Sequence, residues 1–359
     1  MSTLSEIRQF GQRIWLDNLS RTLLNEGGLK RLVEEDGVAG VTSNPSIFYK
    51  AVSDSPYYRE DLARLKASSQ TPEQRYEALV IPDIQAACDL LRPPFDASNG
   101  DDGYVSLEAS PRLAYDEEST VAEAKRLAAL VSRDNVLIKV PATPEGVRAF
   151  ERLIGQGLNV NVTLMFSLQH YEAIAQAYIR GARRWVESGG NPRKLKSVAS
   201  LFLSRVDTLV DKKLEGTGTE AALALRGKAG VATAKLAYRR YREIFHGAAF
   251  ADLAAAGVRP QHPLWASTGT KNPQYSDVMY VEPLIGPETV NTMPDATLAA
   301  FRNHGRVGAT LEQGVGDAEA HDRALEQAGI DMRAVGEQLQ AEGVKLFDDA
   351  FTKLLGLVA

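Results

Sequence analysis

The sequence alternates short apolar runs with longer amphipathic segments, and this alternation limits the folds open to the chain. The short runs are rich in β-branched and aromatic residues and end near glycine, proline or asparagine, as strands do. Eight such runs span residues 13–18, 38–44, 103–110, 135–142, 158–167, 197–204, 262–269 and 288–294. Each run is followed by a stretch that we read as helical. Eight strand–helix pairs in succession predict an α/β protein with a (β/α)8 barrel, or TIM barrel. A doubly wound open sheet is the alternative, because a sequence pattern does not reveal closure.

No linker rich in proline, glycine and serine divides the chain, so we expect one domain over residues 1–359. A chain of 359 residues, 44% of them hydrophobic, can fill the core of a single barrel. Additional helices are expected beyond the eight pairs. The stretch 215–230 is the loosest of the chain and predicts a loop that enters a helix, and the segment ending at Ala359 predicts a C-terminal helical extension on the barrel exterior.

The charge balance and the apolar runs limit the partners and the compartment. The 41 basic residues against 46 acidic ones give a net charge of −5, which argues against a general nucleic-acid binder but allows a small basic pocket. No run approaches the ~20 apolar residues of a membrane span, and the N-terminal segment does not look like a signal peptide. The single cysteine, Cys88, excludes an internal disulfide. We therefore expect a cytoplasmic protein without nucleic-acid or membrane partners.

Polar residues interrupt several predicted strands at a spacing of two. Residues i and i+2 of a strand point to the same face, and in a barrel one face looks toward the axis. These residues are Asp17, Thr42, Asn44, Ser106, Glu108, Lys139, Asn159, Asn161 and Thr163. Barrel active sites lie at the C-terminal ends of the strands. The pattern therefore predicts a polar site there.

Each of these residues also has a purely structural explanation. Thr42 and Asn44 precede a proline and suit a turn or a helix cap. Asn161 and Thr163 suit hydrogen-bonded core positions. Lys139 is the hardest to explain, because a buried ammonium without a partner is strongly unfavourable. An ion pair with Glu108 or Asp17 is its best structural explanation.

A lysine in an apolar strand also has a chemical use. Burial disfavours the ammonium form, and a neutral amine attacks a carbonyl to form a Schiff base. The protonated imine then accepts electrons while a carbon–carbon bond breaks, which needs no metal and no cofactor. The remaining proton transfers require separate acids and bases, and Asp17 and Glu108 supply two carboxylates for them. The five histidines show no metal-ligand spacing, and no nucleotide-binding glycine motif occurs.

Seven segments, in order along the chain, resemble the transaldolase family. They are LDN at 16–18, GVTSNPSIF at 40–48, VSLEAS at 105–110, NVLIKVPAT at 135–143, NVNVTLMFS at 159–167, SLFLSRVD at 200–207 and ASTGTKNP at 266–273. The resemblance implies a (β/α)8 barrel with a Schiff-base lysine on strand four. It also implies transfer of a dihydroxyacetone unit from a ketose phosphate (sedoheptulose 7-phosphate or fructose 6-phosphate) to an aldose phosphate (glyceraldehyde 3-phosphate or erythrose 4-phosphate). This reaction belongs to the non-oxidative pentose phosphate pathway.

The resemblance also assigns roles to single residues. Lys139 is similar to the Schiff-base lysine, Asp17 to the acid/base at the C4 hydroxyl, and Glu108 with Thr163 to the pair that positions the catalytic water. The matching substrate ligands are Thr42, Asn44, Asn161, Ser200, Phe202, Arg205 and Lys271. Lys271 departs from the family pattern, because better-known transaldolases present an arginine after this strand in a shorter segment.

Two other functions compete with a transaldolase. A fructose 6-phosphate aldolase would release free dihydroxyacetone, but such chains are much shorter and differ at the carboxylate that corresponds to Glu108. A catalytically silent barrel that binds sugar phosphates would use Lys139 only as an ion-pair partner. In every reading the partner is a small sugar phosphate, and the chain is expected to be a monomer or a homodimer.

Overall fold

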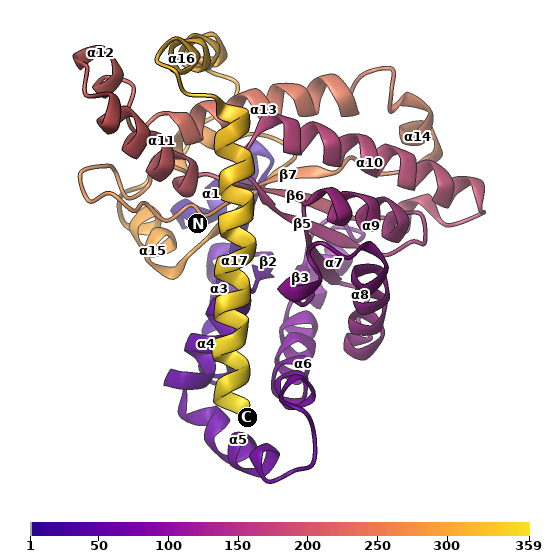
Figure 1. Ribbon diagram of the computed structural model, residues 1–359. Helices are drawn as coiled ribbons and strands as arrows, with labels where there is room; N and C mark the ends of the chain where they lie inside the picture. Colours follow the sequence, from indigo (N-terminus) through magenta and orange to yellow (C-terminus); the bar gives the residue numbers. More distant parts are fainter. Residues whose placement is uncertain (1) are drawn as a thin grey trace.

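Eight parallel strands form a closed barrel in the computed structural model, which describes residues 2–359 (Figure 1). The strands follow one another around the barrel in sequence order, and β1 closes it by pairing with β8. They are β1 (Gln12–Leu16), β2 (Gly40–Thr42), β3 (Tyr104–Glu108), β4 (Val136–Pro141), β5 (Val160–Met165), β6 (Ser197–Phe202), β7 (His262–Ala266) and β8 (Thr289–Met293). Closure confirms the predicted (β/α)8 barrel and excludes the open sheet.

The register of the strands places polar residues of neighbouring strands side by side. Glu108 of β3 is level with Lys139 of β4, and Lys139 is level with Asn161 of β5. Below this polar layer the interior is filled by apolar side chains such as Trp15 and Leu137, which are fully buried in one cluster. Layers of side chains across a barrel of this kind form a packed core. The interior therefore changes from apolar to polar toward the C-terminal ends of the strands.

Seventeen α-helices accompany the barrel within the described residues. They are α1 (Thr3–Ile7), α2 (Arg21–Asn25), α3 (Gly28–Asp36), α4 (Pro45–Asp54), α5 (Arg59–Lys66), α6 (Pro72–Leu90), α7 (Arg92–Ala97), α8 (Glu117–Val131), α9 (Pro144–Ile154), α10 (Leu168–Glu187), α11 (Ser204–Thr217), α12 (Glu220–Leu223), α13 (Ala229–Phe245), α14 (Ala251–Ala256), α15 (Asp295–His304), α16 (Val315–Gln327) and α17 (Met332–Val358). None of these helices is long and apolar enough to cross a membrane.

The turn from β4 into α9 shows how local sequence fixes the end of a strand. Thr143 is the N-cap, and its hydroxyl accepts a hydrogen bond from the Gly146 amide at 3.0 Å, while Pro144 occupies the first helical turn. Gly146 is required here, because a Cβ atom at this position would lie 1.9 Å from the carbonyl oxygen of Pro141. The helix therefore starts in direct contact with the strand that carries Lys139.

The expectation that every strand is followed by a helix is wrong for β7. The connection from β7 to β8 contains only the short 3-10 helix η5 (Glu282–Leu284). Instead of packing as a helix, this loop is tied to α11 by tyrosine hydroxyls: Tyr275 donates to Asp211 and Tyr280 to Asp207, both at 2.7 Å. The region 216–260 after β6 contains α12, α13 and α14, which agrees with the predicted loop that enters a long helical region.

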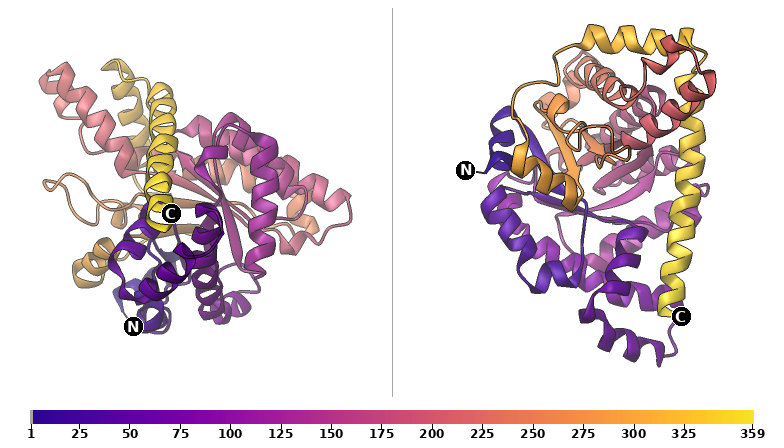
Figure 2. Two further views of the ribbon diagram at one scale, coloured as in Figure 1. Left: turned by 60° about the horizontal axis from the view of Figure 1, so that its bottom comes forward. Right: turned by 90° about the vertical axis from the view of Figure 1, so that its left-hand side faces the viewer.

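The C-terminal helix α17 does not stay on the barrel exterior as the sequence suggests. It runs in front of the barrel from α16 to the neighbourhood of α5 (Figure 1), and Figure 2 shows its length along one side of the molecule. The amide Nε2 of Gln340 donates to the carbonyl oxygens of Ala142 at 2.8 Å and Leu164 at 3.2 Å. These carbonyls follow β4 and lie in β5, so α17 is fastened to the C-terminal end of the barrel.

Candidate functional site

A cavity of about 190 Å³ opens at the C-terminal ends of the strands. Its lining comes from seven strands or the residues just after them, from the start of α11, from the loop after β7 and from α17. The lining residues are Asp17, Thr42, Asn44, Lys139, Thr163, Ser200, Phe202, Arg205, Ala266, Ser267, Gly269, Lys271, Thr292, Pro294 and Phe347. Most of the residues predicted from the sequence therefore meet in one cavity at the expected end of the barrel.

Lys139 lies at the base of this cavity and contacts two oxygen acceptors. Its Nζ donates to the carbonyl oxygen of Ser43 at 3.0 Å and lies 3.3 Å from Oε2 of Glu108. The Lys139 and Glu108 side chains are only 5% and 7% exposed. Burial raises the pKa of the Glu108 carboxyl, although the charge of Lys139 opposes this rise. The ion pair considered as the structural explanation is thus present, but it stands beside a cavity that exposes the amine to a ligand.

Asp17 supplies a second carboxyl group, directly after β1. Its Oδ1 accepts a hydrogen bond from the Thr42 hydroxyl at 2.7 Å, and Thr42 also contacts the Thr292 hydroxyl at 2.7 Å. Burial raises the pKa of Asp17, while the Thr42 hydrogen bond and the charge of Lys139 lower it. Two carboxyl groups in different surroundings can take different proton-transfer roles.

A chain of hydrogen bonds crosses the barrel next to Lys139. The Ser200 hydroxyl donates to Oδ1 of Asn161 at 2.7 Å, and Nδ2 of Asn161 donates to the Ser106 hydroxyl at 3.0 Å. Asn161 lies below the cavity and fixes Ser200, which lines it. The hydroxyl of Thr163 is buried without a hydrogen-bond partner, although Thr163 lines the cavity. An unpaired buried hydroxyl of this kind is available to a water molecule or a ligand.

Asn44 is both a helix cap and a residue of the cavity lining, the two roles that the sequence allowed for it. It is the N-cap of α4, where its Oδ1 accepts a hydrogen bond from the Ile47 amide at 3.1 Å, and it also lines the cavity. The cap uses the amide oxygen and leaves the Nδ2 hydrogens for a ligand.

Two cations, Arg205 and Lys271, line the cavity after the neighbouring strands β6 and β7. Arg205 follows β6, and its Nη1 is buried without a hydrogen-bond partner. Its guanidinium lies over the Phe202 ring, 5.5 Å from the centroid, and burial lowers the Arg205 pKa. Lys271 is exposed in the loop after β7 and lines the same cavity. A phosphate group needs such donors, because a guanidinium fork and an ammonium both bind it well.

Sequence reasoning missed several parts of the site. Thr292 of β8 carried a usable signal, because it is a polar residue near the end of a predicted strand. The backbone carbonyl of Ser43, which accepts from Lys139, could not be found from the sequence, because every residue has a backbone carbonyl. Phe347 gave no signal either, because its sequence neighbourhood is that of an ordinary amphipathic helix and only the path of α17 brings it to the cavity.

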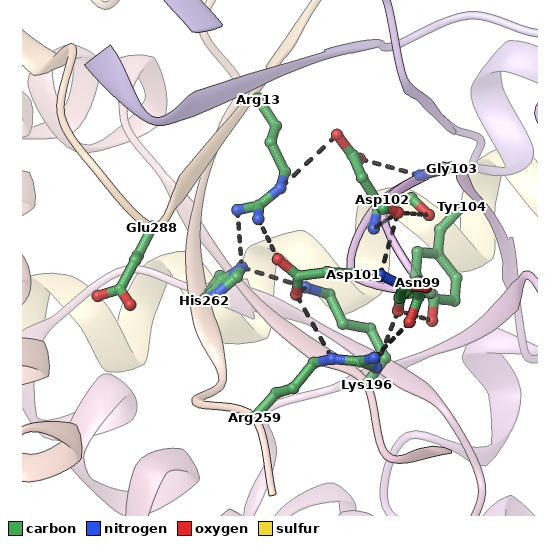
Figure 3. A network of polar contacts seen from close by, with 12 residues as sticks. Arg13, Asn99, Asp101, Asp102, Gly103, Tyr104, Lys196, Arg259, His262 and Glu288 are labelled. Carbon is green, nitrogen blue, oxygen red and sulfur yellow. Dashed lines mark hydrogen bonds and ion pairs between the residues drawn. The ribbon is translucent and has the colours of Figure 1, made fainter. Parts of the chain in front are cut away.

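A second polar cluster lies at the opposite ends of the strands (Figure 3). Nζ of Lys196 donates to Asp101 at 2.8 Å and contacts Nδ1 of His262 at 3.1 Å, and Arg13 forms ion pairs with Asp101 and Asp102. Lys196 is fully buried, and burial lowers the pKa of His262 well below its ordinary value. None of these residues lines the cavity around Lys139, so this cluster is separate from the candidate site.

The fold and the site together define a (β/α)8 barrel that carries a buried amine and two carboxyl groups at the C-terminal ends of its strands. Comparison with known proteins gives the family. The family model described as Transaldolase/Fructose-6-phosphate aldolase matches residues 14–358. The chain therefore belongs to the transaldolase/fructose-6-phosphate aldolase family.

Full-length relatives agree with this assignment. A protein of Thiobacillus denitrificans named transaldolase is 56% identical over 358 residues, covering 100% of both chains. A transaldolase of Frankia alni is 46% identical and covers 99% of this chain and 96% of its own. A transaldolase of Thermobifida fusca is also 46% identical and covers 100% of this chain and 98% of its own. The resemblance inferred from the seven motifs is thus confirmed at the level of the family.

Proposed function

We propose that this protein is a transaldolase that acts through a Schiff base on Lys139. It transfers a dihydroxyacetone unit from sedoheptulose 7-phosphate or fructose 6-phosphate to glyceraldehyde 3-phosphate or erythrose 4-phosphate, as a cytoplasmic enzyme of the non-oxidative pentose phosphate pathway. The observation that carries the proposal is the buried Lys139 amine, 3.3 Å from Glu108 in a cavity that Asp17 also lines. The names of the full-length relatives support it.

The first steps require an amine and a positioned water molecule. The neutral amine of Lys139 attacks the C2 carbonyl of the ketose, and the resulting carbinolamine loses water to give the iminium ion. Glu108 donates and accepts protons in these steps, through a water molecule that it holds together with the unpaired hydroxyl of Thr163. The raised pKa of Glu108 supports this role, because an acid–base catalyst works best with a pKa near the working pH.

Asp17 serves the carbon–carbon cleavage. Its carboxylate takes the proton of the C4 hydroxyl, the C3–C4 bond breaks, and the electron pair moves into the iminium to give an enamine. The shortened aldose phosphate leaves, and the acceptor aldose phosphate reacts with the enamine by the reverse steps. Hydrolysis of the final imine then frees the new ketose and regenerates Lys139.

The remaining predicted residues bind the substrate. Thr42, Asn44 and Ser200 offer hydrogen bonds to the donor hydroxyls, and Asn161 supports them through Ser200. Phe202 forms part of the wall, while Arg205 and Lys271 bind the phosphate. The unpaired Nη1 of Arg205 supports this last role, because a buried guanidinium donor without an acceptor is costly until an anion supplies one.

Trapping tests the proposed mechanism. Borohydride in the presence of fructose 6-phosphate should add a reduced three-carbon unit to the peptide that contains Lys139. Lys139→Arg should give no label, because a guanidinium stays protonated and cannot act as the nucleophile. No label at all would contradict the proposal and would favour a barrel that only binds sugar phosphates, whereas a label on another lysine would contradict the role of Lys139.

A transfer assay separates a transaldolase from an aldolase. With fructose 6-phosphate alone, an aldolase releases free dihydroxyacetone continuously, whereas a transaldolase turns over only when erythrose 4-phosphate is added. Rapid release of dihydroxyacetone that is independent of the acceptor would assign the aldolase activity instead.

A further inference from the structure

We propose that Phe347 of the C-terminal helix is a positioning residue of this site, whose ring holds the Lys139 and Arg205 side chains and shields the covalent intermediate on Lys139 from bulk water while it waits for the acceptor. The inference rests on the proposed Schiff-base function. The Phe347 ring centroid lies 5.9 Å from Nζ of Lys139 and 5.8 Å from the guanidinium carbon of Arg205. One ring thus faces both cations, and the same ring lines the cavity.

The position of the ring is set by how α17 docks on the barrel. Gln340 fastens the helix to the carbonyl oxygens of Ala142 and Leu164, next to β4 and β5. Gly343 lies one turn before Phe347, and a Cβ atom there would lie 2.9 Å from Cδ2 of Leu164. Leu164 has a left-handed backbone conformation, φ 59°, where β5 departs from its regular register. The helix therefore packs closely against the strand residues beside Lys139, which leaves the ring little freedom.

The ring provides a cation-binding face and a barrier. A lysine or arginine cation within about 6 Å of an aromatic centroid is attracted to the ring face. Phe347 is only 4% exposed, so its ring lies between α17 and the barrel, within 5.9 Å of Nζ of Lys139 and 5.8 Å of the guanidinium carbon of Arg205. Phe202 approaches Arg205 from β6 instead, so the guanidinium lies near two rings from different elements.

Shielding matters because the covalent intermediate must wait for its acceptor. This intermediate is the enamine: if a proton adds to its C3 carbon, an iminium forms again, and water can then attack the iminium carbon. The carbon–nitrogen bond then breaks, and the products are free dihydroxyacetone and the Lys139 ammonium. The enamine, one proton and one water molecule supply all the atoms of this side reaction, so a barrier against bulk water and its protons slows it. We infer that Phe347 favours transfer over hydrolysis.

The test measures dihydroxyacetone released per sedoheptulose 7-phosphate formed, with fructose 6-phosphate and erythrose 4-phosphate as substrates. Phe347→Leu keeps an apolar side chain but removes the ring, so the ratio of hydrolysis to transfer should rise roughly two- to tenfold. The matched control is Leu354→Val, which trims a fully buried residue of the same helix that does not line the cavity, and its ratio should equal that of the wild type. If Phe347→Leu does not fold, Phe347→Met replaces it, because the flexible methionine side chain fills an irregular gap better.

The outcomes separate this inference from the proposed function. If the wild type gives no borohydride adduct on Lys139, the proposed function itself fails. If the adduct forms but Phe347→Leu leaves the ratio unchanged, the role of Phe347 is overturned. A rise of equal size in Leu354→Val would also overturn it, because the effect would then come from general loosening of α17.

Discussion

At the scale of single residues, the hydroxyl of Thr42 controls how readily Asp17 ionises. Burial raises the pKa of Asp17, and the hydrogen bond from Thr42 at 2.7 Å opposes this rise by stabilising the carboxylate. In the proposed mechanism Asp17 must be ionised to take a proton, so activity should fall as the pH drops through its pKa. Thr42→Val removes the hydrogen bond, and the acidic limb of the kcat/KM profile should therefore move to higher pH.

Thr42→Ser is the control for this prediction, because it keeps the hydroxyl. Its acidic limb should stay close to that of the wild type, even if the overall rate changes. An acidic limb that does not move in Thr42→Val, or that moves equally in Thr42→Ser, would assign the limb to a group other than Asp17.

Lys271 gives a second prediction at this scale, on substrate binding. A charge-assisted hydrogen bond is worth ~1.5–3 kcal/mol, so Lys271→Ala should lower kcat/KM for phosphorylated substrates by roughly ten- to a hundredfold. Borohydride trapping from unphosphorylated dihydroxyacetone should change little, since that ligand has no phosphate. Lys212→Ala, which removes an exposed lysine of α11 that does not line the Lys139 cavity, is the matched control. Equal losses with both kinds of ligand would give Lys271 a role other than phosphate binding.

The sequence could predict those site residues that break a strand pattern. Lys139 and Glu108 are costly inside apolar runs, and their positions on neighbouring strands follow from the barrel itself. The sequence could not predict which other groups form hydrogen bonds with these two side chains. The Ser43 carbonyl that binds Lys139 is 96 residues away along the chain, and only the folded turn after β2 brings it there.

At the scale of secondary-structure elements, the fit of α17 to the barrel depends on one buried amide. Gln340 satisfies the carbonyl oxygens of Ala142 and Leu164, which are buried below the helix. Gln340→Ala would leave both without this donor. We expect the free energy of unfolding, measured by urea denaturation, to fall by about 1–3 kcal/mol.

Gln338→Ala is the control, two residues earlier on the same helix. Gln338 is exposed and donates only to Glu342 on the helix itself, so its loss should change the free energy of unfolding by less than about 0.5 kcal/mol. If both variants are equally stable, the two hydrogen bonds of Gln340 contribute nothing to docking.

The secondary-structure elements also show which features the sequence pattern predicts and which it does not. Strand positions are predictable, because short β-branched runs and their bounding residues are local features. The absence of a helix between β7 and β8 is not, since Tyr275 and Tyr280 of that loop are held by Asp211 and Asp207 of α11. The path of α17 is not predictable either. Its apolar face fits a helix outside the barrel as well as one across its mouth, and only the contacts of Gln340 and Gly343 decide.

At the scale of the whole molecule, the two ends of the barrel carry their charges differently. At the C-terminal end, Arg205 and Thr163 each leave a buried donor group unpaired, as a binding site requires. At the N-terminal end, Asp101 pairs with Lys196 and Arg13, and Arg259 lies 3.9 Å from it (Figure 3). These residues join loops far apart in the sequence, so the cluster is expected to stabilise the fold and not to take part in the chemistry.

Asp101→Asn tests this division of roles. It keeps the shape of the side chain but leaves the fully buried Lys196 without its carboxylate partner. Removing one partner of a buried pair is strongly destabilising, so the free energy of unfolding at pH 7 should fall by about 3 kcal/mol. The kcat at 20 °C should stay near that of the wild type, because Asp101 lies at the other end of the barrel. The exposed Asp134, which precedes β4, provides the control: Asp134→Asn should change stability by less than about 0.5 kcal/mol.

The pH dependence of the stability lost in Asp101→Asn shows whether the charge of Asp101 is the cause. Burial of Asp101 opposes ionisation, but the positive charges of Lys196 and its neighbours outweigh it and hold the Asp101 pKa well below its ordinary value. A carboxyl group with a lowered pKa in the folded state stabilises the protein fully above its unfolded pKa of ~3.9, and this contribution is lost as the pH falls through the folded pKa. The difference in unfolding free energy between the wild type and Asp101→Asn should therefore be constant from pH 7 to about pH 5 and shrink below about pH 4. A difference that persists unchanged into this acidic range would mean that the side chain stabilises the barrel by packing or neutral hydrogen bonding, and not by its charge.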